Sequence, residues 1–182
     1  MQIVVDGCAN VDVDVHGTGL VVAAGRIATV AHVVAGATAV TVRNEHGQAS
    51  ASVVYFDPVN DVAVLAVERS SAPAVPLGVS PAGSTGTVVV FRDDSRSFLE
   101  VDLRRLVDIR TADMYGEGKH TRPGYELAVD IEGGDSGAVV VDGRAVALVW
   151  SRSRQAENRA WAMRSELLVD HLAATDPHGQ CA

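Results

Sequence analysis

Short apolar segments of alternating polarity, separated by turn-forming residues, run through most of this 182-residue chain. Valine dominates them, since the chain has 32 Val against 11 Leu and 4 Ile, and only eight aromatic residues. A β-branched side chain has few χ1 rotamers and packs well on a pleated surface, so this usage favours strands. Strands that recur every 8–12 residues or so are typical of a sandwich or barrel. We therefore expect an all-β fold.

The predicted strands fall into two groups of about six, separated by a proline-containing stretch. Residues 12–70 form the first group and residues 87–164 the second. Residues 71–86 hold three of the six prolines and few charges, which is typical of an extended linker. We expect residues 1–182 to form a single domain of two six-stranded antiparallel β-barrels.

The alternation ends near the C-terminus. Leu168 and Leu172 lie four residues apart, and Ser165 is a candidate N-cap at the start of that segment. This pattern predicts a short C-terminal helix over residues 165–175.

The charge and hydropathy of the chain argue against nucleic-acid binding and against a membrane span within these 182 residues. The net charge of −8, from 15 Lys+Arg and 23 Asp+Glu, would repel a phosphate backbone, so we expect no nucleic-acid partner. No apolar run approaches the roughly 20 residues that span a bilayer. The first ten residues also lack the features of a signal peptide. If the protein is exported, we expect this chain to be part of a longer protein that could carry a membrane anchor elsewhere.

The two cysteines lie near opposite ends of the chain, at Cys8 and Cys181. This placement excludes a CxxC redox motif and a cysteine-rich zinc site. It leaves open both a disulfide between the chain ends and two free thiols. The five histidines other than His32 lack metal-ligand spacing with one another or with the cysteines, so we expect no metal site. We also expect no organic cofactor.

Three segments place a group with catalytic potential near the end of a predicted strand: TVAHVV with His32, NDVAVL with Asp61, and GGDSGA with Ser136. A serine nucleophile needs a base to take its proton and a carboxylate to orient that base. The glycine-flanked turn would let the N–H groups of Gly134 and Ser136 point at one spot, as in an oxyanion hole. Each segment alone has a common structural explanation. Together, in the order His, Asp, Ser, they indicate a serine hydrolase.

These segments resemble the three active-site segments of the chymotrypsin-fold serine proteases. The resemblance is stronger to the compact HtrA branch of this family. Its members have similar spacings to the 29 residues from His32 to Asp61 and the 75 from Asp61 to Ser136, and a similar strand to GTGL before the histidine. The segments YFDPVNDVAVLAV, DMYGEGKHTRPGYELAVDIEGGDSG and GRAVALVW resemble still more closely the MarP-like proteases of mycobacteria, which are periplasmic, membrane-anchored and linked to acid resistance. The resemblance covers about residues 8–168.

The resemblance implies two β-barrels with the triad between them, a serine endopeptidase activity, and protein or peptide substrates. It also implies a disulfide between Cys8 and Cys181, and with it an oxidising location: the periplasm, the cell envelope or the exterior.

The resemblance further places a substrate pocket between residues 130–133 and residues 149–152. Its candidate residues are Asp130, Glu132, Gly133 and Ser151. Asp130 lies six residues before Ser136, where trypsin carries the acid that selects Arg or Lys. In the predicted fold Arg152 and Arg154 lie close to Asp130 and could instead neutralise its carboxylate.

Two departures from the family pattern concern the oxyanion turn and a loop on the substrate side. Ala138 stands where the family usually has a second glycine after GDSG, and its methyl group could tilt the oxyanion turn. Residues 91–94 replace an HtrA-like turn beside the substrate. The alternative function is a catalytically silent or latent module of the same fold that binds extended peptides by strand addition. Asp135 is expected to hold its turn through local hydrogen bonds.

Overall fold

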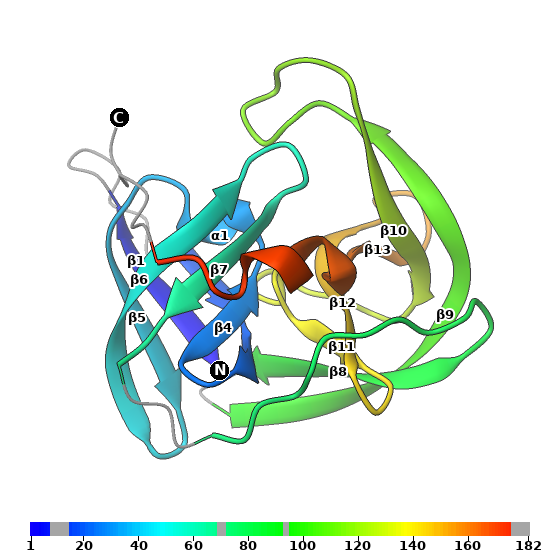
Figure 1. Ribbon diagram of the computed structural model, residues 1–182. Coiled ribbons are helices and arrows are strands. Elements are labelled where there is room, and N and C mark those ends of the chain that lie inside the picture. The colour runs from blue at the N-terminus through cyan, green and yellow to red at the C-terminus, as the bar shows by residue number, and fades with distance from the viewer. Residues whose placement is uncertain (8–14, 69–71, 93–94, 176–182) are drawn as a thin grey trace.

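The computed structural model describes residues 1–7, 15–68, 72–92 and 95–175. The cysteines at positions 8 and 181 lie outside these residues, so their pairing stays a prediction. The described strands form two antiparallel sheets, a seven-stranded sheet and a closed six-stranded barrel, which Figure 1 shows side by side. The all-β two-barrel fold expected from the valine-rich alternation is confirmed.

The N-terminal sheet has seven strands in the order β2-β1-β5-β6-β7-β4-β3. Six were expected, and the additional one is β1, which lies before the predicted range of 12–70 and pairs with both β2 and β5. The strands are β1 (Gln2–Gly7), β2 (Val15–Thr18), β3 (Leu20–Ala23), β4 (Arg26–Thr29), β5 (Ala37–Asn44), β6 (Gly47–Asp57) and β7 (Val62–Ala66).

The C-terminal sheet closes on itself in the order β10-β13-β12-β11-β8-β9, with the expected six strands. Strands β9 and β10 pair along most of their length, from His120 opposite Thr111 to Ala128 opposite Asp102. The strands are β8 (Thr85–Arg92), β9 (Ser95–Thr111), β10 (His120–Ala128), β11 (Val139–Val141), β12 (Ala145–Arg152) and β13 (Ala160–Arg164).

Valine and other small apolar side chains fill both interiors. Val5, Val40 and Val64 are buried in the first sheet, and Val88 and Val140 in the second. Each such side chain contributes about 1.5–3 kcal/mol when it leaves water. Narrow sheet interiors of this kind accommodate branched side chains that large rings would overpack.

Two short helices flank the sheets and correct the sequence predictions. Residues 31–34, expected to continue a strand, form α1 (Ala31–Val34). The C-terminal helix is a 3₁₀ turn, η1 (Ser165–His171), and ends four residues before the predicted end at 175. Ser165 does not cap it, because its hydroxyl donates to the carbonyl oxygens of Ala145 (2.6 Å) and Gly78 (3.1 Å).

Residues 72–84, which fall within the predicted linker of residues 71–86, contact both sheets, whereas residues 85 and 86 already belong to β8 (Figure 1). The amide of Val75 donates to Val21 in the first sheet at 2.9 Å. Three residues later, the amide of Gly78 donates to Ala145 in the second barrel at 3.0 Å. In the described part of the chain, no helix is long and apolar enough to cross a membrane.

Candidate active site

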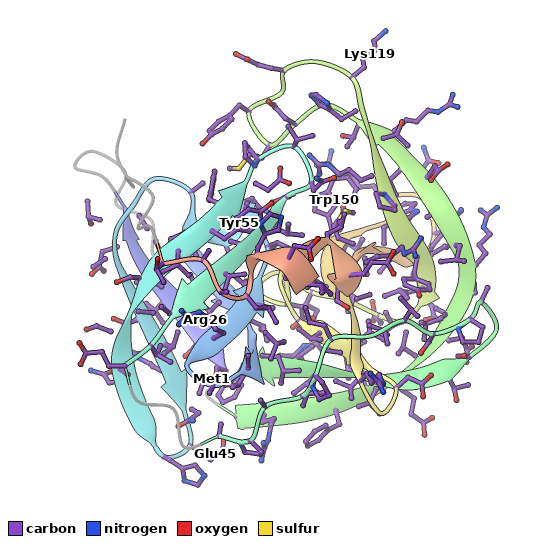
Figure 2. All side chains as sticks on the ribbon, in the orientation of Figure 1. Met1, Arg26, Glu45, Tyr55, Lys119 and Trp150 are labelled. Carbon is purple, nitrogen blue, oxygen red and sulfur yellow. The ribbon has the colours of Figure 1, made fainter. Side chains whose placement is uncertain are left out.

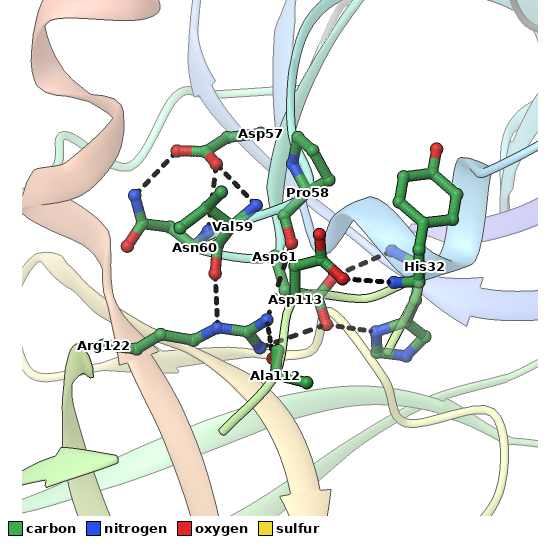
Figure 3. A network of polar contacts seen from close by, with 10 residues as sticks. His32, Asp57, Pro58, Val59, Asn60, Asp61, Ala112, Asp113 and Arg122 are labelled. Atoms are coloured by element: carbon green, nitrogen blue, oxygen red, sulfur yellow. Dashed lines mark hydrogen bonds and ion pairs between the residues drawn. The ribbon is translucent and has the colours of Figure 1, made fainter. Parts of the chain in front are cut away.

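His32 and Asp61 meet in the first sheet. Strand β4 ends at Thr29 and α1 carries His32, while Asp61 occupies the turn before β7. The backbone N–H of His32 donates to Asp61 Oδ1 at 2.8 Å, and His32 Nδ1 lies 2.8 Å from Asp61 Oδ2 (Figure 3). Asp61 is 2% exposed, whereas the imidazole is 34% exposed. The Asp61 carboxylate is therefore buried and held by its two contacts with His32, whereas one third of the His32 ring is open to solvent.

The turn that presents Asp61 is built by a second aspartate. Asp57 Oδ1 accepts the N–H groups of Val59 and Asn60, both at 2.9 Å, and Asp57 Oδ2 accepts Asn60 Nδ2 at 2.7 Å (Figure 3). Asp61 itself has a φ of 55°, a left-handed conformation that aspartate tolerates better than most residues. Side-chain hydrogen bonds thus hold the turn in the shape that directs Asp61 at His32.

The surroundings of Asp61 favour its ionised form. Burial by itself raises the pKa of this carboxyl. The hydrogen bonds from the ring and backbone of His32, with the charges of His32 and Arg122, outweigh burial and lower the pKa below its ordinary value. Asp61 is therefore an anion at neutral pH.

Ser136 lies in a tight turn of the second barrel that docks against the first sheet. Thr18 N donates to the carbonyl of Ser136 at 2.8 Å, and Gly137 N donates to Val149 at 2.9 Å. Gly137 has a φ of 82°, and a Cβ there would overlap the carbonyl oxygen of Thr18 and the hydroxyl of Thr29. The turn therefore lies close to Thr29, which precedes His32 by three residues.

The N–H groups of Gly134 and Ser136 donate to no acceptor among the described residues. Gly134 has a φ of 95°, which a residue with a side chain rarely adopts. The described residues also show no hydrogen bond between Ser136 Oγ and the ring of His32. Within the described part of the chain, both of these N–H groups are therefore unpaired.

A cation from a neighbouring strand anchors this turn. Asp135 is fully buried, and Arg92 at the end of β8 donates to it from Nε (3.2 Å) and Nη2 (2.5 Å). Glu132 N donates to Asp135 Oδ2 at 2.9 Å, which is the kind of local bond expected from the sequence. Sequence reasoning missed Arg92, because nothing in the local pattern pairs it with a residue 43 positions away.

A polar pocket of about 330 Å³ lies next to this turn, between residues 129–131 and 152–159. Of the four candidate pocket residues, Asp130 lines it, whereas Glu132, Gly133 and Ser151 do not. Glu132 instead accepts Arg92 Nη1 at 2.9 Å.

Arg152 does not neutralise Asp130 by direct contact. Arg152 Nη1 donates to the carbonyl of Ile131 at 3.3 Å. Among the described residues, the carboxylate of Asp130 forms no ion pair with Arg152 or Arg154. No group of three or more His, Cys, Asp or Glu side chains in the described ranges could hold a metal ion.

Sequence reasoning also missed Arg122. This arginine of β10 is 1% exposed and lies next to Asp61 (Figure 3). Its guanidinium lies over the ring of Trp150, which is labelled in Figure 2. An arginine in a strand is usually a surface residue, so no local signal marks it as buried.

Comparisons with known proteins agree with this architecture. A family model described as a trypsin-like peptidase domain matches residues 17–149. The chain is 31% identical over 173 residues to the serine protease Rv3671c of Mycobacterium tuberculosis strain H37Rv, which covers 90% of this chain and 44% of that protein. The chain thus spans less than half the length of this curated relative.

Solved structures give the same result. The active form of the Rv3671c protease from M. tuberculosis has a TM-score of 0.91 at 27% identity, over 100% of this chain and 83% of that chain. Its inactive form has a TM-score of 0.78 at 27% identity, over 94% and 87%. The HtrA-type protease AlgW with a tripeptide, at 20% identity, shares the fold, with a TM-score of 0.74 over 93% and 57%.

Proposed function

The chain belongs to the trypsin-like peptidase family, and on this premise we propose that it is a serine endopeptidase whose triad is His32, Asp61 and Ser136. The observation that carries the proposal is the double contact between His32 and Asp61, with both joined atom pairs at 2.8 Å. With its proton on Nδ1 donated to Asp61, the imidazole keeps Nε2 free to act as the base.

The proposed reaction has two halves. Ser136 Oγ attacks the scissile carbonyl carbon while His32 Nε2 takes the hydroxyl proton, and the tetrahedral intermediate collapses as His32 returns that proton to the leaving amine. Water then attacks the acyl-enzyme ester with His32 again as base, which releases the carboxylic acid and restores Ser136. Asp61 stays ionised and stabilises the imidazolium in both halves.

The oxyanion formed in each half is proposed to bind the N–H groups of Gly134 and Ser136. This assignment is supported by the lack of another acceptor for either group in the described chain. Two preorganised donors of this kind stabilise developing charge at no reorganisation cost.

The proposed substrates are proteins or peptides, and the AlgW structure with a tripeptide is a precedent within this fold. The pocket between residues 129–131 and 152–159 is lined in part by Asp130, whose carboxylate forms no ion pair with another described residue. It also contains three arginines, Arg152, Arg154 and Arg159. Profiling a peptide library decides whether a basic residue precedes the cut, and loss of that preference in Asp130→Asn would assign it to Asp130. Cleavage with no enrichment of Lys or Arg would exclude a basic preference.

The resemblance to MarP-like proteases supports a location in the cell envelope, with a role in stress or acid resistance and a membrane anchor elsewhere in the full-length protein. It also supports a disulfide between Cys8 and Cys181. Peptide mapping of the protein purified from an oxidising compartment, with and without reductant, tests the pairing. A linked peptide that disappears on reduction is expected, and two unlinked thiols would refute the pairing.

Hydrolysis of β-casein or a quenched peptide tests the proposed activity. Ser136→Ala, His32→Ala and Asp61→Asn should each lower kcat by about 10³-fold or more. Ser50→Ala is the matched control, because Ser50 is exposed on β6 of the first sheet. A folded wild-type protein that binds the peptide without cutting it would instead support the silent binding module.

A further inference from the structure

A buried arginine lies behind Asp61 that the triad itself does not require. Arg122 is 1% exposed and is the largest fully buried side chain among the described residues. Arginine is almost never fully buried unless it is paired, because removing a charge from water is costly. Its contacts therefore indicate what the burial achieves.

The guanidinium of Arg122 joins two loops from different sheets. Nε donates to the carbonyl of Val59 at 2.5 Å, in the turn that ends at Asp61. Nη2 donates to the carbonyl of Ala112 at 3.0 Å, just after β9 in the second barrel. The guanidinium carbon lies 5.2 Å from the centre of the Trp150 ring (Figure 3 shows the polar contacts).

The third guanidinium nitrogen of Arg122, Nη1, faces the pair formed by His32 and Asp61. Arg122 Nη1 lies 3.8 Å from Asp61 Oδ2, the same oxygen that lies 2.8 Å from His32 Nδ1. Within the described ranges, Asp61 is the one carboxylate within 4 Å of this guanidinium. The cation, the carboxylate and the imidazole therefore form a row in a site that is closed to water on the Arg122 side.

We propose that Arg122 is a positioning residue for the His32 and Asp61 pair: it fixes the turn that carries Asp61, and its charge keeps the pair in the ionised-aspartate, neutral-histidine form. The proposal rests on the proposed function, because the pair has a base to position only if Ser136 is the nucleophile. The stack over Trp150 and the bonds to Val59 and Ala112 hold the guanidinium in place.

The charge acts because it is buried. Asp57 in the turn and Asp113 in the loop after β9 also face Arg122, and His32 on α1 completes the set of titratable groups around Asp61. In this setting the field of a cation is screened far less than at the surface. The His32 and Asp61 pair already holds one proton, on His32 Nδ1. A positive charge beside the pair opposes the binding of a second proton, at His32 Nε2. Removing it should let His32 become protonated, and so inactive as a base, at a higher pH.

The shape of the side chain matters separately from its charge. A planar fork can donate to Val59 and Ala112 at the same time while one edge faces Asp61, whereas an ammonium is a point charge on a flexible stem. Arg122→Lys therefore keeps the charge and loses the two-loop tie. Arg122→Gln removes the charge and keeps one amide donor for a carbonyl oxygen.

The test is the pH dependence of kcat/KM for peptide hydrolysis by wild type, Arg122→Gln and Arg122→Lys. Arg105→Gln is the matched control, because Arg105 pairs with buried Glu126 in the same barrel and does not contact the triad. We expect the acid limb of the Arg122→Gln profile to move up by about one pH unit. We expect kcat/KM at its plateau to fall about tenfold or more. Arg122→Lys should keep the wild-type acid limb but lose rate, and Arg105→Gln should match wild type.

An unmoved acid limb in Arg122→Gln, or a moved one in Arg122→Lys, would overturn the proposal. Either variant decides the matter alone if the other does not fold. NMR titration of the His32 ring in the Ser136→Ala background gives the same comparison without turnover. A shifted His32 titration in a protein that does not hydrolyse peptides would refute the proposed function while supporting the electrostatic role of Arg122.

Discussion

Replacing Gly137 by alanine should destabilise the protein by driving the Ser136 turn away from the first sheet. An alanine forced into a φ of 82° costs about 1–2 kcal/mol. Its Cβ would also lie closer than 3.0 Å to Thr18 O and Thr29 Oγ1, so the turn has to move. That movement stretches the bonds from Thr18 N to Ser136 O and from Gly137 N to Val149 O.

The expected magnitude follows from these contacts. Each of the two hydrogen bonds contributes about 1 kcal/mol, so with the backbone strain Gly137→Ala should lower the free energy of unfolding by about 3–4 kcal/mol. Gly143→Ala is the matched control, because Gly143 also has a positive φ (64°) but a Cβ there meets nothing within 4 Å. The control should cost only about 1–2 kcal/mol.

Urea denaturation followed by tryptophan fluorescence measures both variants, and peptide hydrolysis measures the catalytic effect. A displacement of about 1 Å at Ser136 should lower kcat/KM about 100-fold in Gly137→Ala, while Gly143→Ala keeps wild-type kinetics. Equal loss of stability in the two variants would show that the close approach at Gly137 does not hold the turn, and the docking argument would fail.

Two further predictions concern the buried carboxylates of Asp135 and Asp61. Arg92→Gln leaves the buried Asp135 without its cation and should lower the free energy of unfolding, measured by urea denaturation, by about 3 kcal/mol. The double variant Arg92→Gln/Asp135→Asn should recover most of that loss. A double variant that recovers nothing would show that the ion pair is not the cause. The lowered pKa of Asp61 means that its ionised form stabilises the fold above the ordinary carboxyl pKa of about 3.9 and that this contribution is lost as the pH falls through the folded-state pKa. The stability gap between wild type and Asp61→Asn should therefore narrow from pH 6 to pH 3, and a gap that stays constant with pH would contradict the lowered pKa.

Local patterns predicted the two-barrel fold because alternation and turn residues act over a few positions. The same reasoning failed at α1, since an apolar run such as TVAHVV has no period that separates a strand from a buried helical turn. It missed the strand Gln2–Gly7, because that segment joins the sheet through partners far along the chain. The family resemblance, which the matching family model confirms, rested on segments that stay contiguous in sequence.

The parts of the candidate site that sequence could not predict are its supporting cations. His32, Asp61 and Ser136 sit in recognisable segments, whereas Arg92 and Arg122 look like ordinary surface arginines in strands. Their partners, Asp135 and Asp61, become neighbours only when the barrels close and dock. Buried ion pairs are set by this long-range geometry, so neither spacing nor composition reveals them.

Covalent labelling tests the central claim most directly. A fluorophosphonate reacts when Ser136 Oγ attacks phosphorus, fluoride leaves, and His32 takes the hydroxyl proton. Intact mass and peptide mapping should find one phosphonyl group per wild-type chain, on Ser136, and none in His32→Ala or Ser136→Ala. A folded wild-type protein that stays unlabelled, or that is labelled on another residue, would contradict the assignment of Ser136 as the nucleophile.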